Sequence, residues 1–320
     1  MADVDFDRLA DRLGGERNAP LGESTTYRVG GRAAVRVRVE SQEQLETVAR
    51  ILSEVDVAIL IVGRGSNMLV SDRGFAGVAV QLGRFATECA IDERGDEAIV
   101  RAGGLARLPV VARRTAAGGW TGFEWAVGVP GSIGGAVRMN AGGHGSDMAA
   151  SLVDVDVCDL RSGSARTRTL SELGLRFRGS DLSDHEVVTE ARLRVTRADA
   201  SRCEAAIDEI VAWRREHQPG GQNAGSVFVN PIPGELSAGE LVDRAGLRGR
   251  RLGTAEVSTK HANFIQADDG GTASDVKALM DLVRDQVFER FGIELRSEIR
   301  LVGFDDGSGS DSRNATGVVS

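Results

Sequence analysis

The chain has 320 residues, and its 39 Lys and Arg against 47 Asp and Glu give a formal net charge of −8 at pH 7. A hydrophobic content of 41% and a charged content of 27% are typical of globular proteins and argue against extensive disorder. This length predicts two or three packed units. The acidic balance disfavours nucleic-acid binding, because attraction to a phosphate backbone needs a basic surface.

The cellular compartment is indicated by apolar runs and cysteines. The longest apolar stretch, residues 57–62, falls far short of the roughly 20 residues that cross a bilayer. The acidic N-terminus lacks the features of a signal peptide. Three widely spaced cysteines, an odd number, favour reduced thiols over a disulfide framework. We therefore predict a cytoplasmic protein, monomeric and without membrane insertion.

The N-terminal third has the pattern of a βαβ-like unit. Val and Arg alternate over residues 35–39, which predicts a half-exposed strand. Ser41 with Gln44 forms a capping box, and the helix that it begins carries Leu45, Val48, Ala49 and Leu52 on one face. A buried strand at 57–62 follows and leads directly into a glycine-rich turn.

Further elements follow with the same kinds of signal. Strands are predicted at about 77–82, 97–101, 152–160, 186–196, 262–266 and 294–302, and helices at about 106–117, 202–217, 241–245 and 274–291. The last helix is expected to face inward with Val276, Leu279, Met280, Val283, Val287 and Phe288 and to end at Gly292. Residues 305–320 have little to bury and are predicted to be disordered.

The segment from Gly118 to Gly145 is unusually rich in glycine. Such a density disfavours a regular element, because each glycine costs a helix about 1 kcal/mol relative to alanine. A flexible linker is the alternative, but linkers are polar, and this segment carries Trp120, Phe123 and Trp125. We favour an ordered loop that folds around a ligand.

Two glycine loops in the chain are candidates for phosphate binding. The first, Gly63-Arg64-Gly65-Ser66-Asn67, lacks the third glycine of a dinucleotide fingerprint, and no Walker A motif occurs. Its backbone N–H groups still suit a pyrophosphate, although a simple tight turn fits equally well. The second loop spans 128–136. The two loops together are suited to the two ends of a dinucleotide, and the alternative is two unrelated turns.

Individual side chains also have candidate roles. Arg178 can pair with a carboxylate, and Ser226 follows Gly225 on a tight turn where a hydroxyl can exchange a proton. Glu298 alternates with apolar residues in the last predicted strand. Taken singly, Arg178 is better explained as a surface charge and Ser226 as a plain turn serine, and the simple interpretation of Glu298 is a side chain that faces solvent. The four histidines lie far apart without metal-ligand spacing, so we predict no metal site.

In combination, these segments resemble the UDP-N-acetylenolpyruvoylglucosamine reductase (MurB) family, in its shorter subclass. The resemblance covers roughly residues 20 to 304. In chain order, the matching segments are 25–31, 63–67 with Leu69 and Asp72, 128–140, Arg178 with Ser180, 223–231, 260–264 and Glu298.

The resemblance implies an α+β fold. A two-lobed FAD-binding region of the vanillyl-alcohol-oxidase (PCMH) type would occupy residues 1–197, with lobes at about 20–82 and 83–197. An α+β substrate-binding domain would follow at 202–304, before the tail at 305–320.

The implied activity is that of a UDP-N-acetylmuramate dehydrogenase, an FAD-dependent oxidoreductase that uses NADPH. It would reduce the enolpyruvyl ether of UDP-N-acetylglucosamine to UDP-N-acetylmuramate through bound FAD, in peptidoglycan precursor synthesis. The alternatives are another FAD-dependent oxidoreductase of the same flavin-binding fold and a non-catalytic nucleotide-binding protein.

The resemblance also implies residue roles. Arg178 would stabilise charge on the substrate carboxylate, Ser226 would donate the proton, and Glu298, with a raised pKa, would hold the enol form. Substrate contacts would come from Asn230, Arg214 and His261. The implied FAD contacts are Gly63, Arg64, Gly65, Ser66, Asn67, Val129, Pro130, Gly131, Ser132, Gly134, Gly135, Asn140 and Gly145. Phe177 replaces the tyrosine that usually precedes the family's arginine.

Overall fold

The N-terminal elements form a mixed four-stranded sheet. In the computed structural model, which describes residues 4–304, its strand order is β1 (Glu16–Pro20), β2 (Arg32–Val39), β5 (Phe75–Leu82) and β3 (Ile59–Ile61). β2 and β3 run parallel to β5, and β1 runs antiparallel to β2. The predicted alternation is confirmed, because Val35, Val37 and Val39 are fully buried. They share a core with α1 (Phe6–Leu13) and α2 (Gln42–Ser53).

Helix α2 begins where the capping box predicts. The Ser41 hydroxyl accepts a hydrogen bond from the Gln44 N–H at 3.1 Å. The Gln44 side-chain oxygen in turn accepts one from the Glu40 N–H at 2.7 Å. The first bond satisfies an N–H group that a helix start otherwise leaves without a partner, and the second fixes the residue before the cap, which explains why the boundary was readable from the sequence.

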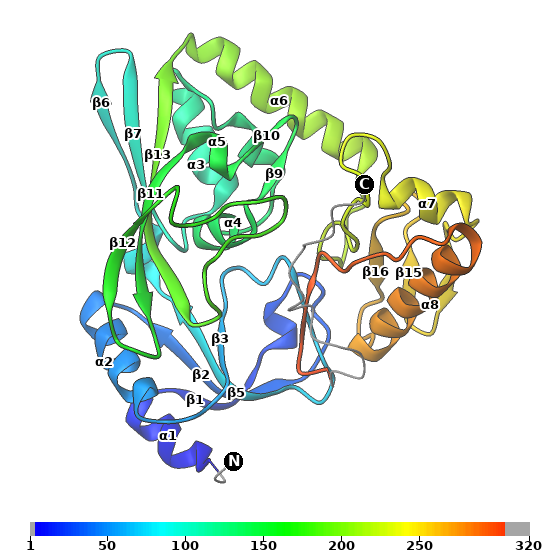
Figure 1. Ribbon diagram of the computed structural model, residues 1–320, viewed down its shortest axis with the longest axis horizontal. Helices are drawn as coiled ribbons and strands as arrows, with labels where there is room; N and C mark the ends of the chain where they lie inside the picture. Colours follow the sequence, from blue (N-terminus) through cyan, green and yellow to red (C-terminus); the bar gives the residue numbers. More distant parts are fainter. Residues whose placement is uncertain (1–3, 305–320) are drawn as a thin grey trace, which may run out of the picture.

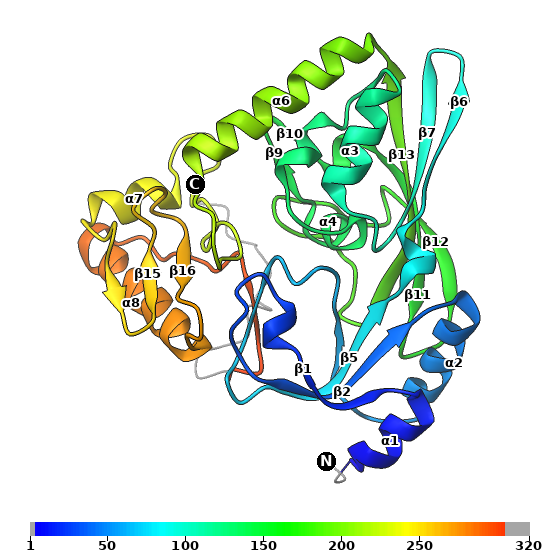
Figure 2. The same ribbon diagram turned by 180° about the vertical axis from the view of Figure 1, so that it is seen from behind.

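A larger sheet follows, and all of its strand pairs are antiparallel. Its order is β12 (Ala165–Thr169), β11 (Leu152–Asp159), β13 (Glu186–Arg197), β7 (Glu97–Gly103) and β6 (Cys89–Arg94), with β8 (Trp120–Thr121) added to β13. Three helical elements contact one another beside this sheet. They are α3 (Leu108–Ala117), the 3₁₀ turn η3 (Glu124–Gly128) and α6 (Ala200–His217). Figures 1 and 2 show the long α6 leading from this sheet to the C-terminal elements.

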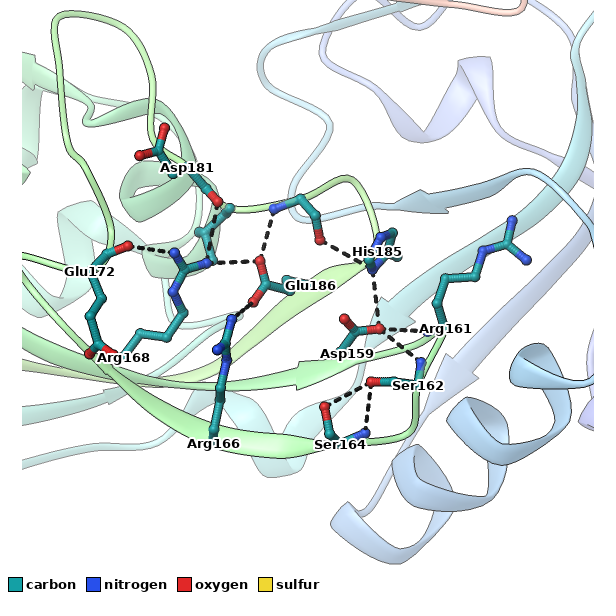
Figure 3. A network of polar contacts seen from close by, with 12 residues as sticks. Asp159, Arg161, Ser162, Ser164, Arg166, Arg168, Glu172, Asp181, His185 and Glu186 are labelled. Atoms are coloured by element: carbon teal, nitrogen blue, oxygen red, sulfur yellow. Dashed lines mark hydrogen bonds and ion pairs between the residues drawn. The ribbon is translucent and has the colours of Figure 1, made fainter.

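A polar network connects β12 to β13 (Figure 3), and its member Arg161 also contacts the segment between α2 and β3. Glu186 accepts from Arg168 at 2.9 Å and from Arg166 at 3.1 Å, and both side chains of the Arg168–Glu186 pair are less than a tenth exposed. Arg161, in the turn after β11, donates to the carbonyl oxygen of Val55 at 2.9 Å, just beyond α2. The two sheets are therefore connected by directed hydrogen bonds as well as by apolar packing.

The glycine-rich segment 118–145 contains more regular structure than predicted. Helix α4 (Ile133–Met139) includes Gly134, whose N–H donates to the carbonyl oxygen of Gly104 at 2.8 Å. A Cβ at Gly134 would lie 3.1 Å from that oxygen and 3.3 Å from Cβ of Val188. The close approach of α4 to β13 thus offsets the helical cost of glycine, and the expectation of an irregular segment was wrong here.

The C-terminal elements form a small α+β unit. Strands β14 (Arg251–Leu252), β15 (Ala255–Val257) and β16 (Ile265–Ala267) pair antiparallel and pack with α7 (Ala238–Arg244) and α8 (Ala273–Phe291). Gly292 ends α8 with a φ of 67°, as predicted. Phe288, predicted to face inward, is instead 55% exposed, because it is rotated by about 100° from the buried Val287 and so points away from the core.

The last strand leaves this unit. β17 (Arg300–Val302) pairs in parallel with β4 (Met68–Val70), directly after the first glycine loop. The predicted strand at 294–302 is therefore shorter, and between 294 and 299 only a single bridge, Phe228 with Ser297, is formed. This return of the chain brings residue 298 to the N-terminal part of the molecule. The predicted disorder at 305–320 lies outside the described residues.

Short elements complete the path around the site. They are η1 (Gly22–Ser24), η2 (Arg84–Thr87), β9 (Gly142–Gly143), β10 (Ser146–Asp147) and α5 (Met148–Ser151). Across residues 4–304, no helix combines the length and the apolar character that a membrane crossing requires.

Candidate active site

A cavity of about 660 Å³ lies where the two glycine loops, the C-terminal end of α6, the 224–226 turn and the start of β17 meet. Its lining includes most of the residues that the sequence singled out. These are Gly63, Arg64, Gly65, Ser66, Asn67, Val129, Pro130, Gly131, Ser132, Gly135, Arg178, Arg214, Ser226 and Glu298. Residues far apart in the chain thus share one concave surface, as expected of a ligand site.

The two glycine loops contact each other directly. The Ser66 hydroxyl donates to the carbonyl oxygen of Pro130 at 2.9 Å. A Cβ at Gly63 would lie 2.6 Å from the Ser132 hydroxyl oxygen, and one at Gly65, where φ is +64°, would lie 2.8 Å from Cα of Thr25. Glycine is therefore required at both positions by close approach, and the loops form one continuous wall.

This wall presents unused hydrogen-bond donors. The backbone N–H groups of residues 63 to 66 donate to no other residue within 4–304. Arg64 is exposed and forms no ion pair with the described part of the chain. Consecutive free N–H groups beside a guanidinium form a cradle for an anion.

Arg178 and Glu298 form an ion pair that also lines the cavity. Nε of Arg178 lies 2.6 Å from Oε1 of Glu298, and the two side chains are 24% and 18% exposed. The Nε–H does not point at a hydrogen-bond acceptor, so the contact is electrostatic without being a well-directed hydrogen bond. Arg178 adopts φ 58°, an unusual conformation for a non-glycine residue, which marks a constrained position.

The environment of Glu298 raises its pKa. Burial is the main cause, and the charge of Arg178 opposes it without cancelling it. The backbone is fixed on both sides, since the Glu298 N–H donates to Val227 at 2.8 Å and its carbonyl oxygen accepts from the Asn67 side chain at 3.1 Å. A raised pKa widens the pH range in which this carboxyl group holds a proton.

Ser226 lies on the turn that the sequence predicted. Gly225 has φ 80°, and its N–H donates to the Asn223 side chain at 3.0 Å, so the backbone turns sharply just before Ser226. The following residues are fixed by Asn263, which exchanges hydrogen bonds with the Phe228 backbone at 3.0 and 2.8 Å. The Ser226 hydroxyl itself has no hydrogen-bond partner in residues 4–304 and lines the cavity.

Arg214 supplies a second positive charge to the lining. It forms no ion pair with any residue in the described range, and burial lowers its pKa. A partly desolvated guanidinium without a carboxylate partner favours an anionic ligand.

Five residues predicted to contact ligands lie outside the lining. Gly134 is inside α4, whereas Asn140 accepts from Ala149 N–H at 3.0 Å and donates to Asp147 at 3.0 Å. The turn between β9 and β10 contains Gly145. Asn230 accepts from the Ala238 N–H at 3.1 Å at the start of α7, and His261 accepts from the Asn263 N–H at 3.2 Å.

Several lining residues were not predicted. Arg138 and Arg300 both form ion pairs with Asp184, the second at 3.1 Å. Arg300 follows Glu298 by two residues, so the alternation expected over 294–302 that marked Glu298 also marked Arg300. His144 and Trp213 line the cavity as well, and their rings contact each other with centroids 5.0 Å apart. No local signal in the sequence connected these two.

Comparison with known proteins decides the family. Residues 217–302 match the model of the UDP-N-acetylenolpyruvoylglucosamine reductase C-terminal domain, and residues 33–167 match that of an FAD binding domain. The UDP-N-acetylenolpyruvoylglucosamine reductase of Heliobacterium modesticaldum is 39% identical over 304 residues, which are 93% of this chain and 95% of that protein.

The chain belongs to the UDP-N-acetylenolpyruvoylglucosamine reductase family. The family member from Gloeobacter violaceus is 40% identical over 282 residues, covering 87% of this chain and 93% of that protein. The crystal structure of the Thermus caldophilus reductase superposes with a TM-score of 0.76 and 32% identity, over 90% of this chain and 98% of that one. The α+β fold with an FAD-binding region, expected from the resemblance, is thus confirmed.

Proposed function

We propose that this protein reduces the enolpyruvyl ether of UDP-N-acetylglucosamine to UDP-N-acetylmuramate, with FAD as cofactor and NADPH as reductant, in peptidoglycan precursor synthesis. The observation that carries this proposal is the convergence of Arg178, Ser226 and Glu298 on one cavity whose glycine-loop wall presents free backbone N–H groups. Such a cavity offers a charge stabiliser, a proton donor and an anion cradle together.

The wall formed by the two glycine loops fits FAD. The N–H groups of residues 63 to 66 suit a pyrophosphate, and a side chain at Gly63 or Gly65 would meet the neighbouring segment. Arg64, Ser66 and the 129–132 segment complete that side of the cavity. When bound, FAD supplies the hydride chemistry that the side chains lack.

The proposal assigns a task to each of the other polar side chains in the cavity. Arg178 neutralises the negative charge that develops on the substrate carboxylate. Glu298, whose pKa is raised by burial, holds a proton beside that carboxylate and stabilises its enol form. The Ser226 hydroxyl, which has no other hydrogen-bond partner within residues 4–304, delivers a proton to the substrate carbon next to the one that accepts the hydride. Arg214 binds the nucleotide phosphates.

The predicted residues outside the cavity are proposed to act by positioning. Asn140 connects the end of α4 to Asp147 and Ala149, and Gly145 shapes the turn that carries His144. His261 packs against Phe264, a lining residue, with ring centroids 4.8 Å apart. Asn230 holds the start of α7.

The proposal also covers the organisation of the chain. The cofactor region comprises residues 1–197 and the substrate domain residues 202–304, and the enzyme acts as a cytoplasmic monomer. The family-model matches at 33–167 and 217–302 support this division. Light scattering of the purified protein tests the monomeric state.

Ser226→Ala tests the assignment of the proton donor. We expect the variant to bind FAD and to be reduced by NADPH at nearly the wild-type rate, whereas its reoxidation by the enolpyruvyl nucleotide slows at least about 100-fold. Rapid-mixing absorbance at the flavin band separates the two steps. A wild-type rate of reoxidation in Ser226→Ala would refute the role of Ser226 as proton donor. If the enolpyruvyl nucleotide does not stimulate NADPH oxidation by the wild-type enzyme, the protein is instead an FAD-dependent oxidoreductase of the same fold that acts on another substrate.

A further inference from the structure

The short stretch of chain between the Arg178 turn and β13 has no role in the proposed chemistry, although it is attached to both partners of the ion pair in the cavity. Ser180 follows Arg178 by two residues. Asp184 pairs with Arg300, which follows Glu298 by two residues. This stretch, residues 180–184, is therefore placed to influence how the two partners meet.

The backbone of the Arg178 turn needs support from its surroundings. Phe177 and Arg178 form a two-residue turn, which is closed by hydrogen bonds in both directions between Arg176 and Gly179, each 3.0 Å long. Arg178 adopts φ 58°, which is unfavourable for a residue other than glycine. Such a conformation persists only where neighbouring groups fix it.

The Ser180 hydroxyl supplies one fixed point next to this turn. It donates to the carbonyl oxygen of Arg138 at 2.8 Å, in the last turn of α4. Carbonyl groups in the last turn of a helix have no partner within the helix, so this oxygen is available to a side chain from elsewhere. The hydroxyl also accepts from the Leu182 N–H at 3.4 Å, which orients it.

The Arg138 side chain holds the same segment in return. Its guanidinium donates to the carbonyl oxygens of Ser183 at 2.7 Å and Leu182 at 3.3 Å. It also pairs with the Asp184 carboxylate. The end of α4 and the 180–184 segment thus exchange contacts in both directions, and a planar guanidinium is suited to several acceptors at once.

Asp184 extends this connection to β17. Its carboxylate pairs with Arg300 at 3.1 Å as well as with Arg138, so it joins the end of α4 to the first residue of that strand. Glu298 lies just before the strand, and its backbone is hydrogen-bonded on both sides. The backbone positions of Arg178 and Glu298 are therefore both referred to the same helix end.

We propose that Ser180 and Arg138 are positioning residues that hold Arg178 in contact with Glu298. The inference rests on the proposed function in taking this ion pair as part of the reaction centre. Neither positioning residue touches the reacting atoms in this assignment, and each acts through the distance between the guanidinium and the carboxyl group.

Two variants that keep the formal charge test this inference. Ser180→Ala removes the hydroxyl, and Arg138→Lys keeps a cation but loses the planar fork. We expect each to raise the pKa of Glu298 further, because a displaced Arg178 opposes the effect of burial less. Infrared difference spectra of the FAD-loaded protein at a series of pH values measure this pKa, through the carboxyl band that Glu298→Gln removes.

The charges around Glu298 stay the same in both variants, so a change in its pKa reports a change in geometry. Besides Arg178, the titratable side chains that line the cavity with Glu298 are Arg64, Arg138, His144, Arg214 and Arg300. Ser180→Ala alters none of them, and Arg138→Lys replaces one cation by another.

The same displacement should appear in the half-reactions of Ser180→Ala. We expect NADPH to reduce the flavin at nearly the wild-type rate, whereas reoxidation by the enolpyruvyl nucleotide slows about tenfold or more, because the groups that meet the substrate are misplaced. The decrease of this rate toward high pH should shift to higher pH, in step with the pKa of Glu298. Ser180→Thr, which keeps a hydroxyl, should restore both the rate and the pH profile.

Ser183→Ala is the matched control. It removes a hydroxyl from the same segment, but that hydroxyl lies 3.1 Å from Nδ1 of His185 and does not contact α4. The pKa of Glu298 and the reoxidation rate should therefore stay at wild-type values. An unchanged or lowered pKa of Glu298 in Ser180→Ala would overturn the assignment of Ser180, and the same result in Arg138→Lys would overturn that of Arg138. Loss of FAD from Ser180→Ala would make Ser180 a structural residue and overturn its assignment as well.

The two proposals fail separately, because the infrared titration needs no turnover. A raised pKa of Glu298 in Ser180→Ala, in a protein that does not reduce the enolpyruvyl nucleotide, would refute the proposed function and leave the positioning role intact. Normal reduction by the wild type, with the same pKa of Glu298 in the wild type and both variants, would refute the positioning role alone.

Discussion

Glu298 shows how the position of one residue sets its chemistry. Its side chain lies 2.6 Å from a guanidinium, which alone would lower the pKa of a carboxyl group, yet burial outweighs this attraction and the pKa is raised. A raised pKa extends the pH range in which the group carries a proton. If the protonated form is the active one, the rate of substrate reduction falls as pH rises through that pKa.

The variant Glu298→Gln tests this reading. We expect substrate reduction to slow at least about 100-fold with FAD still bound, because an amide cannot exchange the proton. We also expect the decrease in rate toward high pH to disappear, since glutamine does not titrate in this range. Rapid-mixing reoxidation rates between pH 5 and pH 9 measure both effects. Loss of FAD from the variant, or an unchanged high-pH limb, would contradict the catalytic assignment.

At the scale of elements, the packing of β12 and β13, which lie on either side of β11, depends on one buried charge pair. Burial by itself would raise the pKa of Glu186, but the Ser183 N–H at 2.9 Å and the charges of Arg166 and Arg168 outweigh it and lower the pKa. A lowered folded-state pKa means that the stabilisation is present above the unfolded-state pKa, which is about 4.3, and is lost as pH falls through the folded-state value.

We predict that Glu186→Gln lowers the free energy of unfolding by about 3–5 kcal/mol, because it leaves the buried guanidinium of Arg168 without its counter-charge. Urea unfolding at pH 7 measures the change. Asp92→Asn is the matched control, since it removes the acidic partner of Arg101 in a pair whose side chains are 47% and 45% exposed, and it should cost less than about 1 kcal/mol. Equal losses of unfolding free energy in the two variants would contradict the distinction between the buried and the exposed ion pair.

The elements that the sequence predicted correctly are those with local signals. Ser41 and Gly292 mark helix ends through their own hydrogen bonds and backbone angles, so α2 and the end of α8 were readable from a few residues. Helix α4 was missed because its glycines are tolerated only through contact with Gly104 and β13, far away in sequence. Phe288 was assigned to the wrong face because it is apolar and adjoins Val287, although the rotation of about 100° between helix neighbours turns it away from the core.

Only those parts of the site that carry a local sequence signal were predictable. Gly63, Gly65 and Ser226 lie on turns that the glycines in the local sequence predict. The structure brings these turns to one cavity. The contact of His144 with Trp213 depends on how α6 packs beside the β9–β10 turn, and no pattern in either segment encodes it. Local chemistry could therefore be inferred from the sequence, whereas its partners required the tertiary structure.

At the scale of the whole molecule, the site depends on how the N-terminal and C-terminal parts join. Tyr27, from the N-terminal segment, is fully buried in the core that contains α7 and α8. Burial raises the pKa of its hydroxyl well above the usual value, and the oxygen has no hydrogen-bond partner within residues 4–304. An unsatisfied buried hydroxyl group destabilises the fold. The aromatic ring of Tyr27, in contrast, packs in this core and stabilises the contact between the N-terminal and C-terminal parts.

The variant Tyr27→Phe is therefore expected to be more stable than the wild type by about 1 kcal/mol, because it keeps the ring and removes the unsatisfied oxygen. Tyr27→Ala should lose about 3–5 kcal/mol, as for other large-to-small core substitutions. Thermal unfolding of both variants measures the difference. A melting temperature of Tyr27→Phe below that of the wild type would show that the hydroxyl has a partner.

Asp72 makes the second connection, and it joins the end of the β4 segment to the start of α8. Its carboxylate accepts hydrogen bonds from the N–H groups of Ala273 at 2.9 Å and Ser274 at 2.8 Å, and from the Ser274 hydroxyl at 2.6 Å. These are the N–H groups that a helix start leaves unpaired, and a negative charge there also complements the helix dipole.

We predict that Asp72→Ala costs about 2 kcal/mol of stability, in line with the loss of a charged helix cap, and that it loosens the C-terminal unit at this joint. Hydrogen exchange should show lost protection at the Ala273 and Ser274 amides. Ser237→Ala, which removes the cap of α7 inside the C-terminal unit, should cost about 1 kcal/mol without affecting those two amides. Because β17 brings Glu298 to the cavity through the same joint, Asp72→Ala should also raise the KM for the enolpyruvyl nucleotide more than Ser237→Ala does. Unchanged protection of both amides would mean that apolar packing alone holds the two parts together.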